Sequence, residues 1–103
     1  MKVAIIMGST SDLPKVEPAI SILKNYGVEV NVRCLSAHRA HLGLSSFIKE
    51  TETDGTEVII TAAGMAAALP GMCAAIFPLP VIGIPMKTSD LGGVDSLYSI
   101  VQM

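Results

Sequence analysis

The segment between Glu57 and Lys87 carries no charged side chain, and this feature most limits what the chain can fold into. An apolar stretch of this length is long enough to cross a bilayer as one helix. Four prolines lie within it, however, and a proline inside a helix removes a backbone hydrogen bond and clashes with the preceding turn. We therefore expect a buried strand, loop, helix and strand of a soluble domain, with no membrane partner.

The composition of the whole chain is typical of one small, well-packed domain. The chain has 103 residues, 50% of them are hydrophobic, and the mean hydropathy is +0.57, which excludes an intrinsically disordered chain. We expect a single domain over 1–103. The formal net charge is −2, and the chain has two Tyr, two Phe and no Trp. A nucleic-acid partner is not expected, because a basic surface and stacking rings cannot be built from this composition.

Short apolar runs alternate with helical patterns along the chain. The runs that predict strands are Lys2–Met7, Val28–Leu35, Glu57–Thr61 and Pro80–Pro85. The helical patterns cover Leu13–Tyr26, His41 to about Thr53 and Pro70–Phe77, and Gly92–Val101 is either the start of a fourth helix or an ordered loop. Pro18 is expected to shorten or kink the first helix. This alternation predicts right-handed βαβ crossovers, and hence an α/β domain with a parallel sheet between two helical layers.

The cysteines and histidines do not suggest a metal cofactor. Cys34 and Cys73 lie far apart in the sequence, and we expect both to be reduced, buried thiols of a cytosolic protein. Cys73 falls in an apolar helix, which favours a core position over a nucleophile. The two histidines, His38 and His41, have no carboxylates patterned around them, so we expect no metal site.

Small polar residues follow the first predicted strand, at the end where ligands bind in an open parallel sheet. Gly8 permits close approach of the backbone to a ligand. Ser9 and Ser11 offer hydroxyl donors to a phosphate at the start of a helix. Asp12 is suited to accept from ribose hydroxyls. Helix capping by Ser11 or Asp12 explains the same residues equally well.

The second predicted strand leads directly into Ser36, His38 and Arg39. A histidine titrates near neutral pH and moves a proton in either direction, so His38 is the candidate general acid/base. The planar fork of Arg39 suits phosphate or carboxylate, and Ser36 adds a hydroxyl. His41 falls at the start of the next helix, where we expect it to be solvent-exposed.

The loops after the third and fourth strands are less informative. Ala62–Gly71 has almost no functional side chains, so it either closes over a small ligand or permits tight packing of helix on sheet. The polar residues 87–90 follow the fourth strand and either complete a polar rim of the site or, as we rather expect, are simply exposed to solvent. The sequence offers no recognisable Ser-His-Asp arrangement of the kind used in nucleophilic catalysis.

Four stretches together resemble the family of N5-carboxyaminoimidazole ribonucleotide mutases and aminoimidazole ribonucleotide carboxylases. They are IIMGSTSD (Ile5–Asp12), SAHR (Ser36–Arg39), AAGMAAALPGM (Ala62–Met72) and GVDSLYSIVQM (Gly93–Met103). The resemblance covers essentially the whole chain and implies a flavodoxin-like three-layer α/β/α fold. It also implies a cytoplasmic enzyme of purine biosynthesis that needs no cofactor. The family forms a symmetric homo-oligomer, an octamer, with active sites completed between subunits.

The resemblance further implies the reaction and the roles of individual residues. N5-carboxyaminoimidazole ribonucleotide would be converted to 4-carboxy-5-aminoimidazole ribonucleotide, with carbon dioxide released, trapped and added back at carbon. His38 would be the acid/base at the ring carbon. The implied substrate-binding residues are Ser9, Ser11 and Arg39 for the phosphate, Asp12 for the ribose, Ser36 nearby, and Gly64, Ala68 and Leu69 for the trap.

The sequence departs from the family pattern at two places. Ala68 stands where the family usually has His before Leu-Pro-Gly, and family members usually continue past Val101–Met103 into another strand and helices. Arg39 favours the mutase class, because the carboxylase class tends to carry Lys at this position. A carboxylase that uses carbon dioxide directly, a non-catalytic nucleotide-binding remnant and a purely structural subunit are the alternatives to the mutase.

Overall fold

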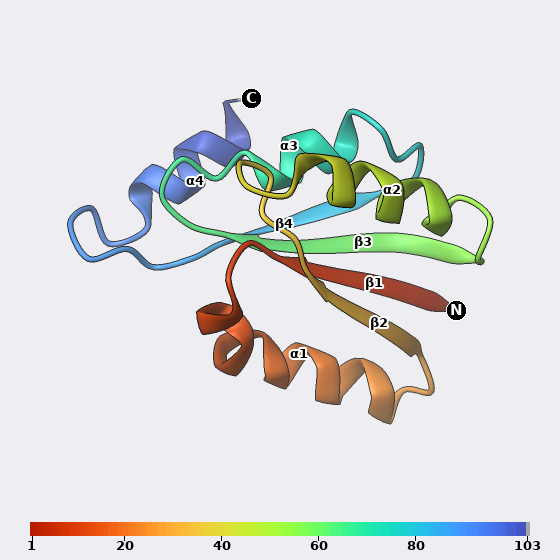
Figure 1. Cartoon of the computed structure of the whole chain (residues 1–103). Helices are drawn as coiled ribbons and strands as arrows, with labels where there is room; N and C mark the ends of the chain where they lie inside the picture. The colour runs from red at the N-terminus through yellow and green to blue at the C-terminus, as the bar shows by residue number, and fades with distance from the viewer. Residues whose placement is uncertain (103) are drawn as a thin grey trace.

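The four apolar runs form one parallel sheet with the strand order β2-β1-β3-β4 (Figure 1). The computed structural model describes residues 1–102, so that Met103 lies outside the described residues. The strands are β1 (Lys2–Met7), β2 (Glu29–Cys34), β3 (Thr56–Ala63) and β4 (Val81–Pro85). The helices are α1 (Leu13–Asn25), α2 (His41–Thr51), α3 (Leu69–Ala74) and α4 (Val94–Val101), with a short 3-10 turn, η1 (Thr10–Asp12), before α1. The predicted alternation of parallel strands and helices is confirmed.

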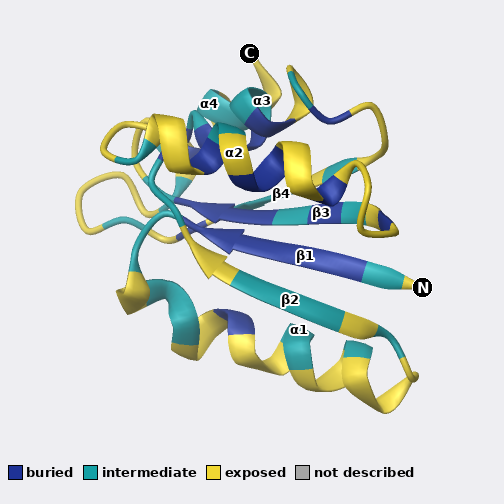
Figure 2. Ribbon diagram, turned by 45° about the vertical axis from the view of Figure 1, so that its right-hand side comes forward, coloured by how far each residue is buried: buried dark blue, intermediate teal, exposed yellow. Residues whose placement is uncertain are grey.

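β1 lies at the centre of the sheet because its sequence is almost entirely apolar. It pairs with β2, from Lys2 opposite Glu29 to Met7 opposite Cys34, and with β3 on its other side. Residues 3–7 of β1 are buried, as Figure 2 shows in dark blue. Strands buried on both faces carry continuous apolar runs instead of alternation. Because all pairs are parallel, the carboxyl ends of the four strands lie at one edge of the sheet.

Helices cover both faces of the sheet, but unevenly (Figures 1 and 2). α1 lies alone on one face, where Val16 packs with Val3 and Ile5 of β1. The other three helices lie on the opposite face and enclose a larger core. The buried members of that core are Ala4, Ile6, Ala37, Leu44, Phe47, Ile48, Ile59, Ala63, Ala67, Leu69, Cys73 and Phe77. This is the expected three-layer α/β/α arrangement, with the strand order of a flavodoxin-like sheet.

β3 is longer than the sequence pattern predicts. It runs to Ala63, whereas the pattern predicts an end at Thr61 and a loop from Ala62 onward. Ala62 and Ala63 are both buried, because their small side chains fit between the strand and the helical layers. The loop before α3 is therefore shorter and spans residues 64–68, and α3 ends at Ala74 instead of position 77.

Two helices also differ from the prediction. α1 continues through Pro18 without a break, so the predicted shortening there is wrong. Val16 and Ile20, on either side of the proline, pack on the sheet and hold the helix in place. α4 begins at Val94 and not at position 92, because the glycines at 92 and 93 have positive φ angles that are incompatible with a right-handed helix.

The uncharged segment between Glu57 and Lys87 folds as β3, a loop, α3 and β4, as its prolines predict. Pro70 lies in the first turn of α3, and Pro85 is the last residue of an edge strand, which are positions that proline tolerates. Within residues 1–102, no helix combines the length and apolar character needed to cross a membrane.

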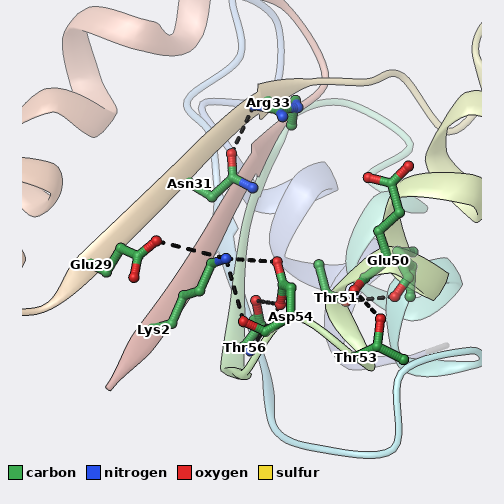
Figure 3. Close-up of polar contacts among 10 residues, drawn as sticks. Lys2, Glu29, Asn31, Arg33, Glu50, Thr51, Thr53, Asp54 and Thr56 are labelled. Atoms are coloured by element: carbon green, nitrogen blue, oxygen red, sulfur yellow. Dashed lines mark hydrogen bonds and ion pairs between the residues drawn. The ribbon is translucent and has the colours of Figure 1, made fainter.

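A polar cluster lies at the opposite end of the sheet, where the strands begin (Figure 3). The Lys2 ammonium lies 2.8 Å from the Asp54 carboxylate and 3.7 Å from that of Glu29. Asp54 also accepts hydrogen bonds from the backbone N–H and the hydroxyl of Thr56, at 2.9 and 2.6 Å. The bonds from Lys2 and Thr56 lower the pKa of the Asp54 carboxyl below its ordinary value. The cluster therefore fastens the start of β1 to the start of β3.

Replacing Asp54 with Asn tests this cluster through the pH dependence of stability. Because the pKa of Asp54 is lower in the folded chain, its contribution is present above about pH 4 and is lost as the pH falls through the folded-state pKa. The pair is partly exposed and screened by solvent, so we expect a small loss of stability at pH 7. Urea unfolding should show a difference between wild type and Asp54→Asn that shrinks at low pH. An equal difference at both pH values contradicts this explanation.

Gly83 of β4 has no room for a side chain. A Cβ atom there would lie 2.9 Å from Cγ2 of Ile100 in α4 and 3.1 Å from Cγ of Pro70 in α3. Both neighbours belong to helices that pack directly on this strand. The missing side chain thus lets α3 and α4 pack close to the sheet. The loops that precede these two helices, at residues 64–68 and 86–93, are positioned with them.

Gly83→Ala should therefore destabilise the chain by about 1–3 kcal/mol, the usual cost of overpacking a filled contact. Gly43→Ala is the matched control, because a Cβ at Gly43 meets its nearest neighbour at 3.5 Å and lies inside α2. We expect this control to be neutral or slightly stabilising, since Ala favours helix more than Gly does. Urea denaturation measures both variants, and unchanged stability of Gly83→Ala would show that the packing here is loose.

Candidate active site

A cavity of about 530 Å³ opens at the carboxyl ends of the strands. The loops after successive parallel strands converge at this edge, which is where ligands bind in open α/β sheets. Segments that follow each of the four strands contribute to the wall. The lining residues are Gly8, Ser9, Asp12, Ser36, Ala37, His38, Arg39, residues 63–69, residues 86–91 and Asp95.

All the predicted site residues except Ser11 line this cavity. The Ser11 side chain is exposed, and its hydroxyl lies 2.9 Å from that of Ser9. The Ser11 backbone N–H donates to Ser9 Oγ at 3.3 Å, so Ser9 caps η1. Asp12 makes no capping hydrogen bond, and capping by Ser11 or Asp12 is therefore not what these residues do. Ser11 orients the Ser9 hydroxyl, while Ser9 and Asp12 face the cavity.

Residues 36–40 form a tight turn that carries two of the predicted groups. The Ala40 N–H donates to the Ser36 carbonyl at 2.9 Å, and the Arg39 N–H donates to Ser36 Oγ at 3.3 Å. The Ser36 hydroxyl therefore supports the turn as well as lining the cavity. The Arg39 guanidinium donates to the carbonyl of Gly8 at 3.3 Å. This contact places the arginine beside the serine turn, so that hydroxyl and guanidinium donors share one wall.

His38 points from the same turn toward the loop after β3. Its Nε2 lies 3.3 Å from the carbonyl oxygen of Ala66. A carbonyl oxygen only accepts, so this contact is a hydrogen bond when Nε2 carries the proton, which leaves Nδ1 free to accept one. His38 is exposed and lines the cavity, so a ligand has access to the ring.

The loop at residues 64–68 forms an apolar wall. Met65 has a φ angle of 57°, a left-handed conformation that is uncommon for a residue other than glycine. The N–H groups of Ala67 and Ala68 donate to the carbonyls of Met65 and Ala66 at 2.9 and 2.8 Å. Ala67 and Leu69 are buried in the core, while the whole loop lines the cavity. The loop therefore packs tightly, as one interpretation predicts, and it also lines the cavity; its closure over a small ligand stays a prediction.

The fourth wall contains residues 87–90, for which the sequence analysis favours simple exposure over a place in the site, and Asp95, which it does not name. Lys87 and Asp90 are exposed, as expected, but they also line the cavity. Asp95 lies in the first turn of α4, and its carboxylate accepts a hydrogen bond from the Thr88 hydroxyl at 2.7 Å. The signal that could have found it is an acidic residue just after two glycines at the start of a predicted helix.

The remaining titratable candidates lie away from the cavity. Cys73 is buried, and this burial raises the pKa of its thiol to about 12, so the thiol stays protonated at neutral pH. Cys34 is exposed, because it ends β2 at the edge of the sheet, and the prediction that both thiols are buried is wrong. His41 is exposed at the first residue of α2, as expected. Over the described part of the chain, no three potential metal ligands cluster.

The fold and the cavity define a class of protein. It is an α/β domain with hydroxyl and guanidinium donors for an anion at one side of a pocket, and an accessible histidine beside an apolar wall at the other. The comparison with protein families then identifies the group. The AIR carboxylase family model matches residues 2–103, and the chain belongs to the AIR carboxylase family.

The similarity extends to named relatives. The chain is 53% identical over 102 residues to the N5-carboxyaminoimidazole ribonucleotide mutase of Thermotoga maritima, covering 99% of this chain and 60% of that protein. It is 54% identical over 101 residues to the phosphoribosylaminoimidazole carboxylase of Saccharomyces cerevisiae, covering 98% of this chain and 18% of that protein. The crystal structure of Treponema denticola PurE matches with a TM-score of 0.90 at 35% identity, covering 99% of this chain and 65% of that one. The chain thus spans less than two thirds of the length of these relatives.

Proposed function

We propose that the chain converts N5-carboxyaminoimidazole ribonucleotide to 4-carboxy-5-aminoimidazole ribonucleotide in purine biosynthesis. One observation carries this proposal. A single turn directs Arg39 toward Gly8 of the serine turn and His38 toward Ala66 of the apolar loop. A phosphorylated ribose attached to a small ring matches this division, because its charged end and its reacting end need different surroundings.

The phosphate would bind between the serine turn and the arginine. Ser9, oriented by Ser11, offers a hydroxyl, and Arg39 offers charge-assisted hydrogen bonds to the phosphate oxygens. Asp12 lines the same side of the cavity and would accept from the ribose hydroxyls, with Ser36 close by. This binding would fix the ring at the other end of the cavity, next to His38.

The proposed reaction has two bond changes at the ring. The bond between the exocyclic nitrogen and its carboxylate breaks, the nitrogen keeps the electron pair and takes up a proton from the protonated His38, and carbon dioxide is released. The ring carbon then attacks the carbon dioxide and loses its own proton to His38. A His38 ring that donates from Nε2 to Ala66 has Nδ1 available for that proton. Such acid/base catalysis contributes about 10²–10⁴-fold.

Carbon dioxide has to stay in the cavity between these two steps. In the wall formed by Gly64, Ala68 and Leu69, no side chain forms hydrogen bonds with water, because Gly64 has no side chain and the other two are apolar. A neutral intermediate needs a dry, close-fitting pocket of this kind. Ala68 contributes only a methyl group where the family usually has an imidazole, so the proposal assigns confinement to the loop as a whole.

A direct carboxylase is the second candidate, and the Saccharomyces cerevisiae relative favours it by name. Aminoimidazole ribonucleotide would then occupy the same site, and its ring carbon would attack carbon dioxide taken from solution. The proton would pass to His38 as before. The two candidates differ only in the source of the carbon dioxide.

An isotope experiment separates the two candidates. The purified chain is supplied with substrate labelled with ¹³C in its N-carboxyl group, in unlabelled bicarbonate. The mutase predicts a 4-carboxy product that keeps the label, and little product from aminoimidazole ribonucleotide with bicarbonate. The carboxylase instead predicts faster product formation from aminoimidazole ribonucleotide with bicarbonate than from the labelled substrate. No product from either pair overturns both.

We further propose that the chain acts in the cytoplasm as a homo-oligomer, an octamer as in the family. Four large apolar side chains on α4 support association, because they are 44–64% exposed at helical spacing. They are Val94, Leu97, Tyr98 and Val101. Analytical ultracentrifugation of the purified chain tests the proposal, and a monomer at micromolar concentration contradicts it.

A further inference from the structure

The Thr88 side chain ties the loop at residues 88–93 to α4. The Thr88 hydroxyl donates to Oδ1 of Asp95 at 2.7 Å and accepts from the backbone N–H of Gly93 at 3.1 Å. The Gly92 N–H donates to the Thr88 carbonyl at 3.1 Å. Residues 88–93 therefore form a closed loop, and the hydroxyl of Thr88 is the side-chain group that joins it to the helix.

The methyl group of Thr88 faces Gly64 of the loop after β3. Its Cγ2 lies 3.8 Å from the position that a Cβ atom on Gly64 would take. The Cβ of Met86 lies 3.5 Å and the buried Ser96 hydroxyl 3.9 Å from the same position. Ser96 in turn donates to the Met86 carbonyl at 2.8 Å. Gly64 therefore rests against both the segment after β4 and α4.

α4 also supports the loop after β3 one residue further along. The Ser99 hydroxyl lies 2.8 Å from the Asp95 carbonyl and 3.3 Å from the Met65 carbonyl. Among the described residues, Met65 alone has a positive φ angle without being glycine. A conformation of this kind persists where the surrounding structure enforces it. Two walls of the cavity are thus held together through α4.

We propose that Thr88 and Asp95 are positioning residues for the reaction, and that they act through the loop at residues 64–68. This inference rests on the proposed function and adds the part of the chain that holds the loop at residues 64–68 in place. Without the Thr88 hydroxyl, Asp95 and the Gly93 N–H lose their shared partner, and the contact with Gly64 loosens. Carbon dioxide released from the nitrogen then escapes to solvent. The amine keeps the electron pair and the proton, and aminoimidazole ribonucleotide accumulates instead of the 4-carboxy product.

Two substitutions of Thr88, by valine and by serine, distinguish the effect of its hydroxyl from the effect of its shape. Thr88→Val keeps the shape and removes the hydroxyl, whereas Thr88→Ser keeps the hydroxyl and removes the methyl group. We expect Thr88→Val to raise the ratio of carbon dioxide released to 4-carboxy product formed by about tenfold, and Thr88→Ser to stay near the wild-type ratio. A general loss of stability lowers both quantities together and does not change the ratio. An unchanged ratio in Thr88→Val overturns the inference.

A second pair at Asp95 covers the case in which Thr88→Val fails to fold. Asp95→Asn keeps an oxygen that accepts from Thr88, so we expect it to behave as wild type, while Asp95→Ala should release carbon dioxide as Thr88→Val does. Equal ratios for these two variants contradict the inference.

Hydrogen exchange provides a readout that needs no substrate. In the free chain, amides at residues 64–68 should exchange about tenfold faster in Thr88→Val and in Asp95→Ala than in wild type, with little change in Thr88→Ser. If the wild type makes no product, the proposed function fails, and exchange still decides whether Thr88 holds the loop. Equal exchange in wild type and all variants overturns the inference on its own.

Discussion

His38→Asn should abolish measurable formation of the 4-carboxy product while nucleotide binding stays nearly unchanged. The asparagine amide can still donate a hydrogen bond in place of Nε2, but it cannot take up a proton. The loss of the acid/base group alone lowers turnover by about 10²–10⁴-fold. Binding is expected to persist because the proposed phosphate contacts are made by Ser9 and Arg39, on the far side of the turn. Product formation and isothermal titration with the nucleotide measure the two effects separately.

His41→Asn is the matched control for this experiment. His41 is the first residue of α2, is exposed and does not line the cavity, so the variant should keep wild-type turnover. A His38→Asn variant that turns over as fast as the wild type would remove His38 from the reaction. Weakened binding without a change in turnover would make it a ligand contact only.

Arg39→Ala should weaken nucleotide binding by about 10–150-fold. Hydrogen bonds to charged groups contribute about 1.5–3 kcal/mol, and the Arg39 guanidinium is held beside the serine turn by its hydrogen bond to the Gly8 carbonyl. Arg39→Lys should lose part of this affinity, because it keeps the charge and loses the planar fork. Titration calorimetry with the nucleotide measures each variant.

Two controls show whether the loss concerns the phosphate. Arg33→Ala removes a charge whose guanidinium is held by Asn31 at 2.7 Å and stacks on Phe47 at 5.1 Å, and this residue does not line the cavity. We expect it to bind as the wild type does. The unphosphorylated nucleoside should bind wild type and Arg39→Ala equally. An equal loss for the nucleoside and the nucleotide would place Arg39 at another part of the ligand.

Much of the fold follows from local patterns in the sequence. KVAIIM is apolar after Lys2, which predicts a strand buried on both faces, and β1 lies inside the sheet, between β2 and β3. Each loop with small polar residues follows a strand, so parallel pairing brings these loops to one edge. The cavity at that edge, with Ser9, His38 and Arg39 in its wall, could therefore be predicted before any coordinates.

The errors arose where tertiary packing decides. Pro18 is unfavourable in a helix by itself, but the helix persists because Val16 and Ile20 pack on the sheet. Cys34 is exposed because the strand order makes β2 an edge strand, and a local pattern does not contain that order. The hydrogen bond between Thr88 and Asp95 forms because the loop at residues 88–93 turns back on itself. The turn needs positive φ angles at the glycines 92 and 93, and the sequence alone does not give these angles.

The crystal structure of the chain with bound 4-carboxy-5-aminoimidazole ribonucleotide tests the central claim most directly. We predict that the phosphate lies within hydrogen-bond distance of Ser9 and Arg39. The ring carboxylate should lie between His38 and the loop at residues 64–68. A nucleotide bound outside this cavity, or one whose ring lies beyond reach of His38, would contradict the assignment of the site and of the reaction.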